Sequence, residues 1–276
     1  DSARHNQRYL LLVTDVLHGK DRQRSTGVLL IGHGTRNYKG TSQFFELSEQ
    51  LQGVLGQIPV QPSLLEFQEP SILQGWMKLA EQGVNHIHVS PLLLFAAGHA
   101  KKDIPDALQE CQQLTPHITY DQCRPLSRHA NMLELAVQRA SAALNEIDER
   151  PDQTALVMVG RGSYDPCASA DMQILSSLVA HRSNYAEVRT AFYAMTEPKL
   201  QDVLECLAQE EDYATIVVQP HLLFEGRLYQ AIVKQVEEIA STHPQRQWKV
   251  TDYLGPNKLV ALSIAGRIHQ ACETGH

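Results

Sequence analysis

Two histidines and a glutamate in the first half of this 276-residue chain have the residue types of a metal site. His33, Glu66 and His99 each follow a short apolar run, so the three lie at comparable places in a repeating pattern. Imidazole nitrogens and carboxylate oxygens together suit divalent first-row ions such as iron(II), cobalt(II) or nickel(II). Three protein ligands leave coordination positions open, and an ion held in this way can be passed to another molecule.

The apolar runs before these residues are typical of strands buried on both faces, and segments with helical spacing follow them. The expected strands are 28–31, 60–65, 87–94 and 118–123, and the expected helices are 41–55, 72–82, 104–114 and 129–147. Thr41 and Ser42 are the expected caps of the first helix. This alternation predicts an α/β fold, a parallel sheet with helices on both faces. Parallel strands share one carboxyl edge, where open α/β folds bind ligands, so His33, Glu66 and His99 are expected to converge there.

The second half of the chain repeats the first about 128 positions later. The segment 28–36, VLLIGHGTR, is matched by 156–164, LVMVGRGSY. The three proposed metal ligands are replaced by Arg161, Ala194 and Arg227, the last across a gap of one residue. A second metal site is therefore not expected.

The repeat predicts two tandem flavodoxin-like domains related by a pseudo-twofold axis. A tail or peripheral element covers 1–26, a catalytic domain 27–148, and a degenerate domain that completes the substrate cleft 153–276. The strands of the second copy are expected near Ala155, Glu187, Thr215 and Trp248. The first lobe would handle metal and the second would bind substrate, and one fused chain makes a monomer the expected state.

Composition and charge exclude several classes of protein. The formal net charge is −7 and no basic stripe is present, which argues against a nucleic-acid partner. The five cysteines are odd in number and form no C-x-x-C pair, which favours a reducing cytoplasm over a disulfide framework. The apolar runs are too short for a membrane span or a signal-peptide core.

Three segments of the first half resemble the signature segments of the sirohydrochlorin chelatases of the class II chelatase superfamily. They are GHGTR at 32–36, LEFQEPSI at 65–72 and PLLLFAAGHAKKDIP at 91–105. The resemblance extends from about Val28 to Arg267, and the duplicated length is similar to the long, two-repeat form of the family. It implies ATP-independent insertion of Fe2+ or Co2+ into sirohydrochlorin, for sirohaem or cobalamin synthesis, with no cofactor beyond the substrate metal.

The resemblance also implies roles for individual residues. His33 and His99 match the metal-binding and catalytic pair of the family, and Glu66 matches the carboxylate of its second segment. Metallation requires two pyrrole N–H protons to leave, and an imidazole that titrates near neutrality can accept a proton. We expect His33, Glu66 and His99 to present the metal, with His99 preferred as the proton acceptor.

A tetrapyrrole with eight carboxylates, which the resemblance implies, must find cations on this acidic chain. The expected substrate contacts are Arg36, Lys39, Lys101, Lys102, Arg161 and Arg227, together with the backbone N–H groups of Gly34 and Gly162. An exposed helix start is the alternative role for the two adjacent lysines. His221 is left open between a substrate contact and a core histidine.

Two further groups of residues have structural interpretations. Glu69 precedes a proline in both copies, and we expect it to cap the helix that starts near Ser71. His86 and His88 lie on one face of a strand start and can be metal ligands, although a partly buried strand edge is the favoured interpretation.

Two other functions remain open from the sequence. A non-catalytic carrier of metal or tetrapyrrole would use the same residues without turnover. A histidine phosphatase is the second alternative, because the segment from His33 to Arg36 superficially resembles a phosphate loop. Gly32, however, stands where such a loop has an arginine.

Overall fold

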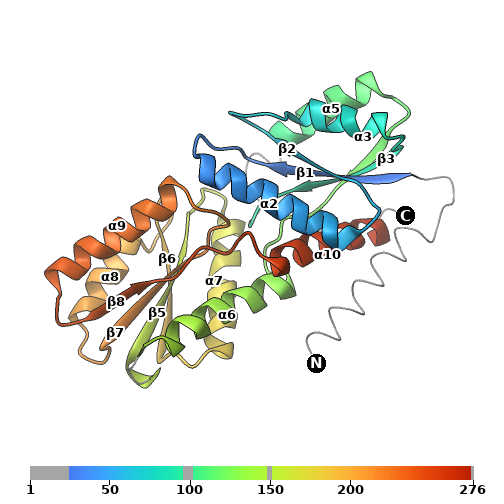
Figure 1. Cartoon of the computed structure of the whole chain (residues 1–276). Coiled ribbons are helices and arrows are strands. Elements are labelled where there is room, and N and C mark those ends of the chain that lie inside the picture. The colour runs from blue at the N-terminus through green and yellow to red at the C-terminus, as the bar shows by residue number, and fades with distance from the viewer. Residues whose placement is uncertain (1–24, 96–101, 148–150, 275–276) are drawn as a thin grey trace. The chain divides into compact units, whose positions relative to one another are not determined.

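The computed structural model describes residues 25–95, 102–147 and 151–274, which form two four-stranded parallel sheets (Figure 1). The first sheet has the order β2-β1-β3-β4 and the second the order β6-β5-β7-β8. The strands are β1 Thr26–Gly32, β2 Val60–Leu64, β3 His86–Pro91, β4 Thr119–Gln122, β5 Thr154–Gly160, β6 Glu187–Phe192, β7 Thr215–Pro220 and β8 Gln247–Val250.

Helices connect the strands in the alternating order that the sequence predicts. They are α2 Tyr38–Leu55, α3 Ile72–Glu81, α5 Asp103–Leu114, α6 Ala130–Asn145, α7 Pro166–Arg182, α8 Leu200–Gln209, α9 Arg227–Thr242 and α10 Lys258–Thr274, with a short 3-10 turn at Pro151–Gln153. The predicted fold class, two tandem parallel α/β domains of the flavodoxin-like type, is confirmed. None of the helices in the described part of the chain is long and apolar enough to span a membrane.

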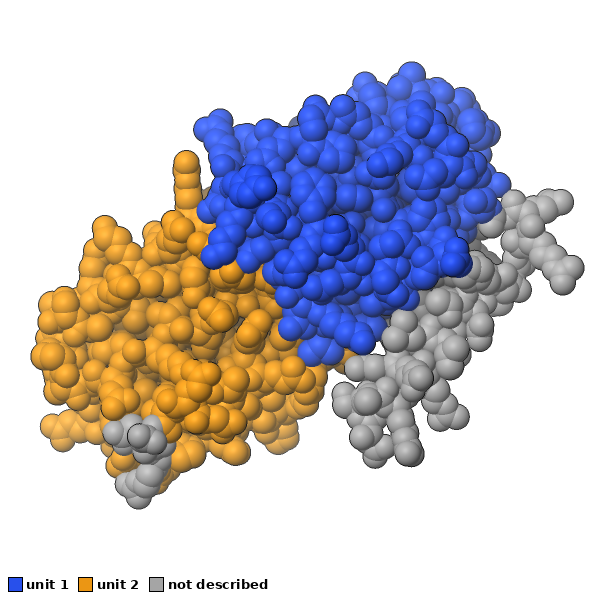
Figure 2. All heavy atoms as spheres, in the orientation of Figure 1, with its two compact units in different colours: residues 1–126, 256–276 blue, residues 127–255 orange. Residues whose placement is uncertain are grey.

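The two compact units do not follow the repeat boundary. Unit 1 contains the described residues up to Leu126 together with those from Pro256 onward, and unit 2 contains Ser127–Gly255 (Figure 2). Helix α10 therefore belongs to unit 1, where it contacts α2 and β3, and the two helices lie side by side in Figure 1. Helix α6 belongs to unit 2, where it contacts α7 and β7. In the predicted domains 27–148 and 153–276, each repeat keeps its own last helix. In the structure α6, the last helix of the first repeat, belongs to unit 2, and α10, the last helix of the second repeat, belongs to unit 1.

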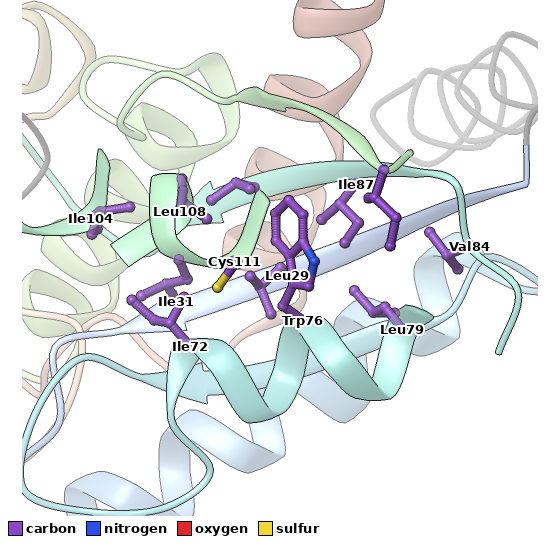
Figure 3. Packing of buried hydrophobic residues seen from close by; sticks show 12 residues of the cluster. Leu29, Ile31, Ile72, Trp76, Leu79, Val84, Ile87, Ile104, Leu108 and Cys111 are labelled. Carbon is purple, nitrogen blue, oxygen red and sulfur yellow. The ribbon is translucent and has the colours of Figure 1, made fainter. Parts of the chain in front are cut away.

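The core of unit 1 follows from alternation along buried strands. Leu29 and Ile31 of β1 point toward α3 and α5, where they pack against Trp76, as Figure 3 shows. The indole Nε1 of this fully buried tryptophan donates to the hydroxyl of Thr115 at 2.8 Å, so its one polar group is paired. A second cluster in unit 2 repeats this pattern, with Ala155, Val157 and Val159 of β5 at its centre.

The loop after β1 is shorter than the sequence predicts. Helix α2 begins at Tyr38, and its N-cap is Asn37, whose side chain accepts hydrogen bonds from the backbone N–H groups of Lys39 and Gly40. The prediction that Thr41 and Ser42 cap this helix is wrong. The hydroxyl of Thr41 instead donates back to the carbonyl of Asn37 at 3.2 Å, inside the first turn.

Candidate functional site

The pairing of β1 with β2 brings His33 and Glu66 together at the carboxyl edge of the first sheet. The register ends at Gly32 and Leu64, and the backbone pairing continues for two more hydrogen bonds. Leu65 N donates to Gly32 O at 2.9 Å, and Glu66 N donates to His33 O at 3.1 Å. Both the imidazole and the carboxylate are exposed. The sequence expected this pair to converge, and the backbone contact places them as neighbours.

Gly34 makes that contact sterically feasible. Its φ is +90°, a conformation that side chains rarely adopt. A Cβ atom at this position would lie 2.0 Å from the carbonyl oxygen of Glu66. The glycine after His33 therefore lets the first loop approach the end of β2, which fixes the spacing between the two candidate metal ligands.

An exposed aromatic side chain lies beside this pair. Phe67 has a φ of 70° and is 56% exposed, and the guanidinium carbon of Arg36 lies 5.0 Å from its ring centroid. A non-glycine residue held at positive φ costs on the order of 1–3 kcal/mol, and such residues gather at functional sites. The sequence analysis missed Phe67. The matching residue of the second repeat, Met195, has a similar backbone conformation, with a φ of 62° and 40% exposure.

The third predicted segment follows β3, which pairs with β1 on the side opposite β2. Leu92 N donates to Ile31 O at 2.8 Å, so the chain leaves β3 at the same edge as His33. Lys102 is the exposed N-cap residue of α5. His99 and Lys101 lie in 96–101, outside the described residues, and their convergence with His33 and Glu66 stays a prediction.

The second sheet carries the same turn with different side chains. Ala194 N donates to Arg161 O at 3.0 Å, as Glu66 N does to His33 O. Gly162 has a φ of +89°, and a Cβ there would lie 1.8 Å from the carbonyl oxygen of Ala194. The Arg161 side chain is exposed at this edge. The backbone of the candidate metal turn is thus kept in unit 2, where an arginine and an alanine replace its ligands.

Arg227 is the first residue of α9 and is exposed. The N-terminus of a helix carries a partial positive charge, so a guanidinium there does not stabilise the helix. The same charge and the unpaired backbone N–H groups favour an anionic ligand. Arg227 follows β7, which pairs with β5, so it and Arg161 come from neighbouring strands of unit 2.

His221 is a buried residue at the end of β7. It is 2% exposed, and burial lowers the pKa of its imidazole from 6.5 to about 4. A neutral, enclosed ring fits the core histidine that the sequence analysis kept as one of two roles. The substrate-contact role for His221 has no support from this geometry.

Glutamates before the two prolines act at helix starts, as predicted. Glu69 Oε2 accepts from the backbone N–H of Ser71 at 3.3 Å, and Glu197 Oε2 accepts from that of Lys199 at 3.0 Å. Ser71 and Gln74 form a capping box at the start of α3. Glu69 therefore serves the helix rather than the group around His33.

Comparison with known proteins gives the family. The CbiX family model matches the chain twice, over residues 27–143 and 155–271. This chain belongs to the CbiX family. The resemblance drawn from the three segments of the first half is thereby confirmed, and both repeats of this CbiX chain carry the family pattern.

Similar proteins are known for this CbiX chain over most of its length. The sirohydrochlorin cobaltochelatase of Priestia megaterium is 30% identical over 247 residues, which cover 89% of this chain and 80% of that protein. The sirohydrochlorin ferrochelatase of the same organism is 33% identical over 229 residues, which cover 83% and 84%. The solved structure of SirB from Bacillus subtilis with Fe3+ has a TM-score of 0.81 at 25% identity, and covers 91% of this chain and 97% of its own. A cobalt complex of SirB from the subspecies spizizenii gives 0.75 at 26% identity, with 90% and 96% covered.

Proposed function

We propose that this CbiX-family chain is a sirohydrochlorin chelatase that inserts Fe2+ or Co2+ into the macrocycle without ATP. The observation that carries the proposal is the turn in which Gly34 brings His33 onto Glu66 at the carboxyl edge of β1. In support of the proposal, the backbone of His33 is hydrogen-bonded to that of Glu66, so a candidate nitrogen ligand and a candidate oxygen ligand are neighbouring residues in a chain similar to named chelatases over most of its length.

The metal substrate is bound by His33, Glu66 and His99 in this proposal. Support comes from the exposure of the first two side chains, which leaves them accessible to an ion and to a macrocycle. Two imidazoles and one carboxylate fit Fe2+ and Co2+ and do not fill an octahedral shell. Incomplete coordination favours transfer of the ion, since fewer protein bonds must break before the macrocycle nitrogens take over.

Proton removal is the second requirement of the reaction. Two pyrrole N–H protons must leave as the metal enters, and a histidine close to the metal can take them because its pKa lies near neutrality. We assign this role to His99. Phe67 offers an apolar surface beside the metal ligands for the face of the macrocycle, and Arg36, stacked on it, can bind a carboxylate at the rim.

The second unit contributes cations rather than metal ligands. Arg161 and Arg227 occupy the positions of His33 and His99 and bind substrate carboxylates through a planar, permanently charged fork. Lys39, Lys101 and Lys102 add further cations from the first unit. In this assignment, loss of a second-unit arginine weakens substrate binding and leaves the chemical step intact.

A turnover assay tests the proposal directly. Anaerobic mixing of the protein with sirohydrochlorin and Co2+ or Fe2+ should shift the absorption of the macrocycle faster than metal alone, with many products per protein. A carrier would stop after one equivalent. A phosphatase would leave the spectrum unchanged and release phosphate from a phosphomonoester. Competition between the two ions in the same assay gives the metal preference, and rescue of a sirohaem-deficient strain by the gene tests the sirohaem pathway.

The expected setting is a reducing compartment, with the chain as a monomer. All five cysteines are free, in line with an intracellular enzyme. Light scattering on the purified protein measures the mass, and a dimer would contradict the monomer.

A further inference from the structure

A second group of metal-ligating side chains lies in unit 1 at the opposite ends of the strands. His86 opens β3 and pairs with Thr26, the first residue of β1, whereas His33 follows the last residue of β1. His86, His88 and Asp121 each offer one ligand atom, and these atoms lie within 4.8 Å of one another. Since β3 runs for six residues, its two ends are about 17 Å apart. This group is therefore separate from the proposed substrate-metal site.

The strand register gathers these side chains on one face. His86 pairs with Thr119 and His88 with Asp121, so alternate residues of β3 and β4 point to the same side of the sheet. His86 Nε2 lies 3.0 Å from Asp121 Oδ2, and His88 Nδ1 lies 2.9 Å from the same oxygen. Helix α10, which contacts β3, supplies Cys272, whose Sγ is 3.6 Å from His88 Nε2.

The outer nitrogen of each imidazole already has a hydrogen-bond partner. His86 Nδ1 is 2.7 Å from the hydroxyl oxygen of Thr119, which itself donates to the carbonyl of Asn85 at 3.4 Å. With the Thr119 hydroxyl proton directed at Asn85, the hydroxyl oxygen can accept from the Nδ1–H tautomer of His86. The hydrogen-bond partner of His88 Nε2 is the sulfur of Cys272. Contacts of this kind orient histidines that bind metals, and they leave the inner nitrogen of each ring facing Asp121.

The inner nitrogens of the two imidazoles and the Asp121 carboxylate face one another, and either ring protons or one metal ion can lie between them. A neutral imidazole offers a lone pair on its unprotonated nitrogen, and a carboxylate offers only lone pairs. The side chains of His86 and His88 are 12% and 4% exposed and that of Asp121 is 28% exposed, so water screens the group only from one side.

The second repeat shows that the sheet does not need this group. The matched pairs in β7 and β8 are Thr215 with Gln247 and Val217 with Lys249, in the same parallel register. Lys249 stands where the first repeat has Asp121, and its ammonium binds Glu146 instead. The same two strands therefore form with a hydroxyl, an alkyl group and a cation on this face, so packing alone does not account for His86, His88 and Asp121.

We propose that His86 Nε2, His88 Nδ1 and the Asp121 carboxylate bind one divalent first-row transition ion, such as Zn2+ or Co2+. Two nitrogens and one oxygen form a set that these ions accept, with a fourth position left for water on the exposed side of the carboxylate. β4 is an edge strand, and the ion would tie it to β3. The site is not part of the proposed chelatase reaction.

A variant that removes the substrate-metal site isolates this second one. The full chain carrying His33→Ala and Glu66→Ala is stripped with a chelator and titrated with Co2+, followed by calorimetry and by visible d–d absorption. Both substitutions are at exposed loop positions, so the fold is expected to persist. One Co2+ per chain should remain bound, with the spectrum of a nitrogen- and oxygen-ligated ion. Binding of no ion by this variant would overturn the proposal.

Substitutions in the group then assign the ion to its ligands. On the same background, the pair His86→Gln and His88→Gln, or the isosteric Asp121→Asn, should weaken binding by about 100-fold or more. His117→Gln, at an exposed histidine of the same unit, is the matched control and should bind as the background does. Circular dichroism identifies the folded variants, and unchanged Co2+ affinity in a folded Asp121→Asn protein contradicts the assignment.

Activity separates this inference from the proposed function. With His33 and Glu66 intact, the paired glutamine variant should turn over sirohydrochlorin at the wild-type rate. If the wild type turns over but the His33→Ala, Glu66→Ala variant binds no ion, the second site fails and the chelatase assignment stands.

Discussion

The two units each contain the same backbone turn, and the two copies carry different side chains. In unit 1 the loop glycine meets the carbonyl of Glu66, and in unit 2 Gly162 meets that of Ala194 with nearly the same φ. Where the first turn presents His33, the second presents Arg161. A framework held by glycine and backbone hydrogen bonds does not depend on the side chains it displays. Duplication can therefore exchange the proposed metal ligands for other side chains without loss of the fold.

The largest expected effect comes from making the first turn resemble the second. His33→Arg or His33→Ala should lower kcat/KM by about 10²- to 10⁴-fold, the range for loss of a general acid–base or ligand histidine. The substitution is at an exposed position, so the free energy of unfolding should change little. Initial rates of macrocycle metallation under anaerobic conditions measure it.

The reverse comparison is the control for that loss. Arg161→Ala at the matching place in unit 2 should leave kcat near the wild-type value. Equal losses of kcat in the His33 and Arg161 variants would end the division of labour between the units.

The next effect tests the shared turn itself. Gly34→Ala and Gly162→Ala both place a methyl group about 2 Å from a backbone carbonyl, at a φ near +90°. Each should reduce the free energy of unfolding by about 1–3 kcal/mol, measured by urea denaturation. Only Gly34→Ala should also abolish most turnover, because it displaces Glu66 from His33.

Gly53→Ala is the matched control for these glycine substitutions. It lies in α2, where a Cβ meets nothing within 4 Å, and alanine is the better helix former. Its stability should equal or exceed that of the wild type. A Gly34→Ala protein as stable and active as Gly53→Ala would show that the close approach to Glu66 is dispensable.

Loss of a second-unit arginine should have a smaller effect, confined to substrate binding. Arg161→Ala or Arg227→Ala removes hydrogen bonds to a charged group, each of which contributes about 1.5–3 kcal/mol, so KM should rise about 10- to 100-fold. The effect should shrink as ionic strength rises. Steady-state kinetics at two salt concentrations measure both, and a kcat that falls while KM holds would assign these residues to the chemical step instead.

The last prediction concerns stability at acid pH, outside the range where turnover is measured, and again compares matched positions. Leu92 in unit 1 and His221 in unit 2 donate from their backbone N–H groups to Ile31 and Val159, both at 2.8 Å. Burial lowers the pKa of His221 from 6.5 to about 4. The stability that comes from keeping His221 neutral is thus fully present above pH 6.5. As the pH falls from 6.5 toward 4, the free energy of unfolding decreases by about 1.4 kcal/mol per pH unit.

His221→Leu copies the first unit and should flatten that part of the stability profile. Urea denaturation at several values between pH 7 and pH 4 measures it, and His181→Gln, at an exposed histidine, should follow the wild type. A His221→Leu protein that loses stability on acidification as steeply as the wild type would rule out this residue as the cause.

Much of the fold and the pairing of His33 with Glu66 could be predicted from the sequence. Apolar runs of strand length identify the strands, and parallel pairing then dictates which loops meet. The position of Phe67 could not be predicted, since a positive φ at a non-glycine residue leaves no periodic signal. Two members of the second group, His86 and His88, could be identified from the sequence. The third, Asp121, could not, because it joins them only through the register of β3 with β4.

The exchange of the last helices between the two units is the feature that the sequence predicts least well. Helices α6 and α10 both carry apolar faces, and nothing in the periodicity states which sheet each one covers. Ala140 of α6 accepts a hydrogen bond from Tyr185 of unit 2, whereas Cys272 of α10 lies against His88 of unit 1. Such a choice depends on the connecting loops and on packing over long sequence separations.

That exchange has a consequence for synthesis on the ribosome. Unit 2 is one continuous stretch and can close as soon as Gly255 has emerged, but the N-terminal unit must wait for the final helix. Until then, the surface that receives Val260, Leu262 and Ile264 has no cover, although its own sheet was translated first. A premature stop codon even within α10 would therefore damage unit 1, whose sheet precedes unit 2 in the chain, and leave unit 2 whole.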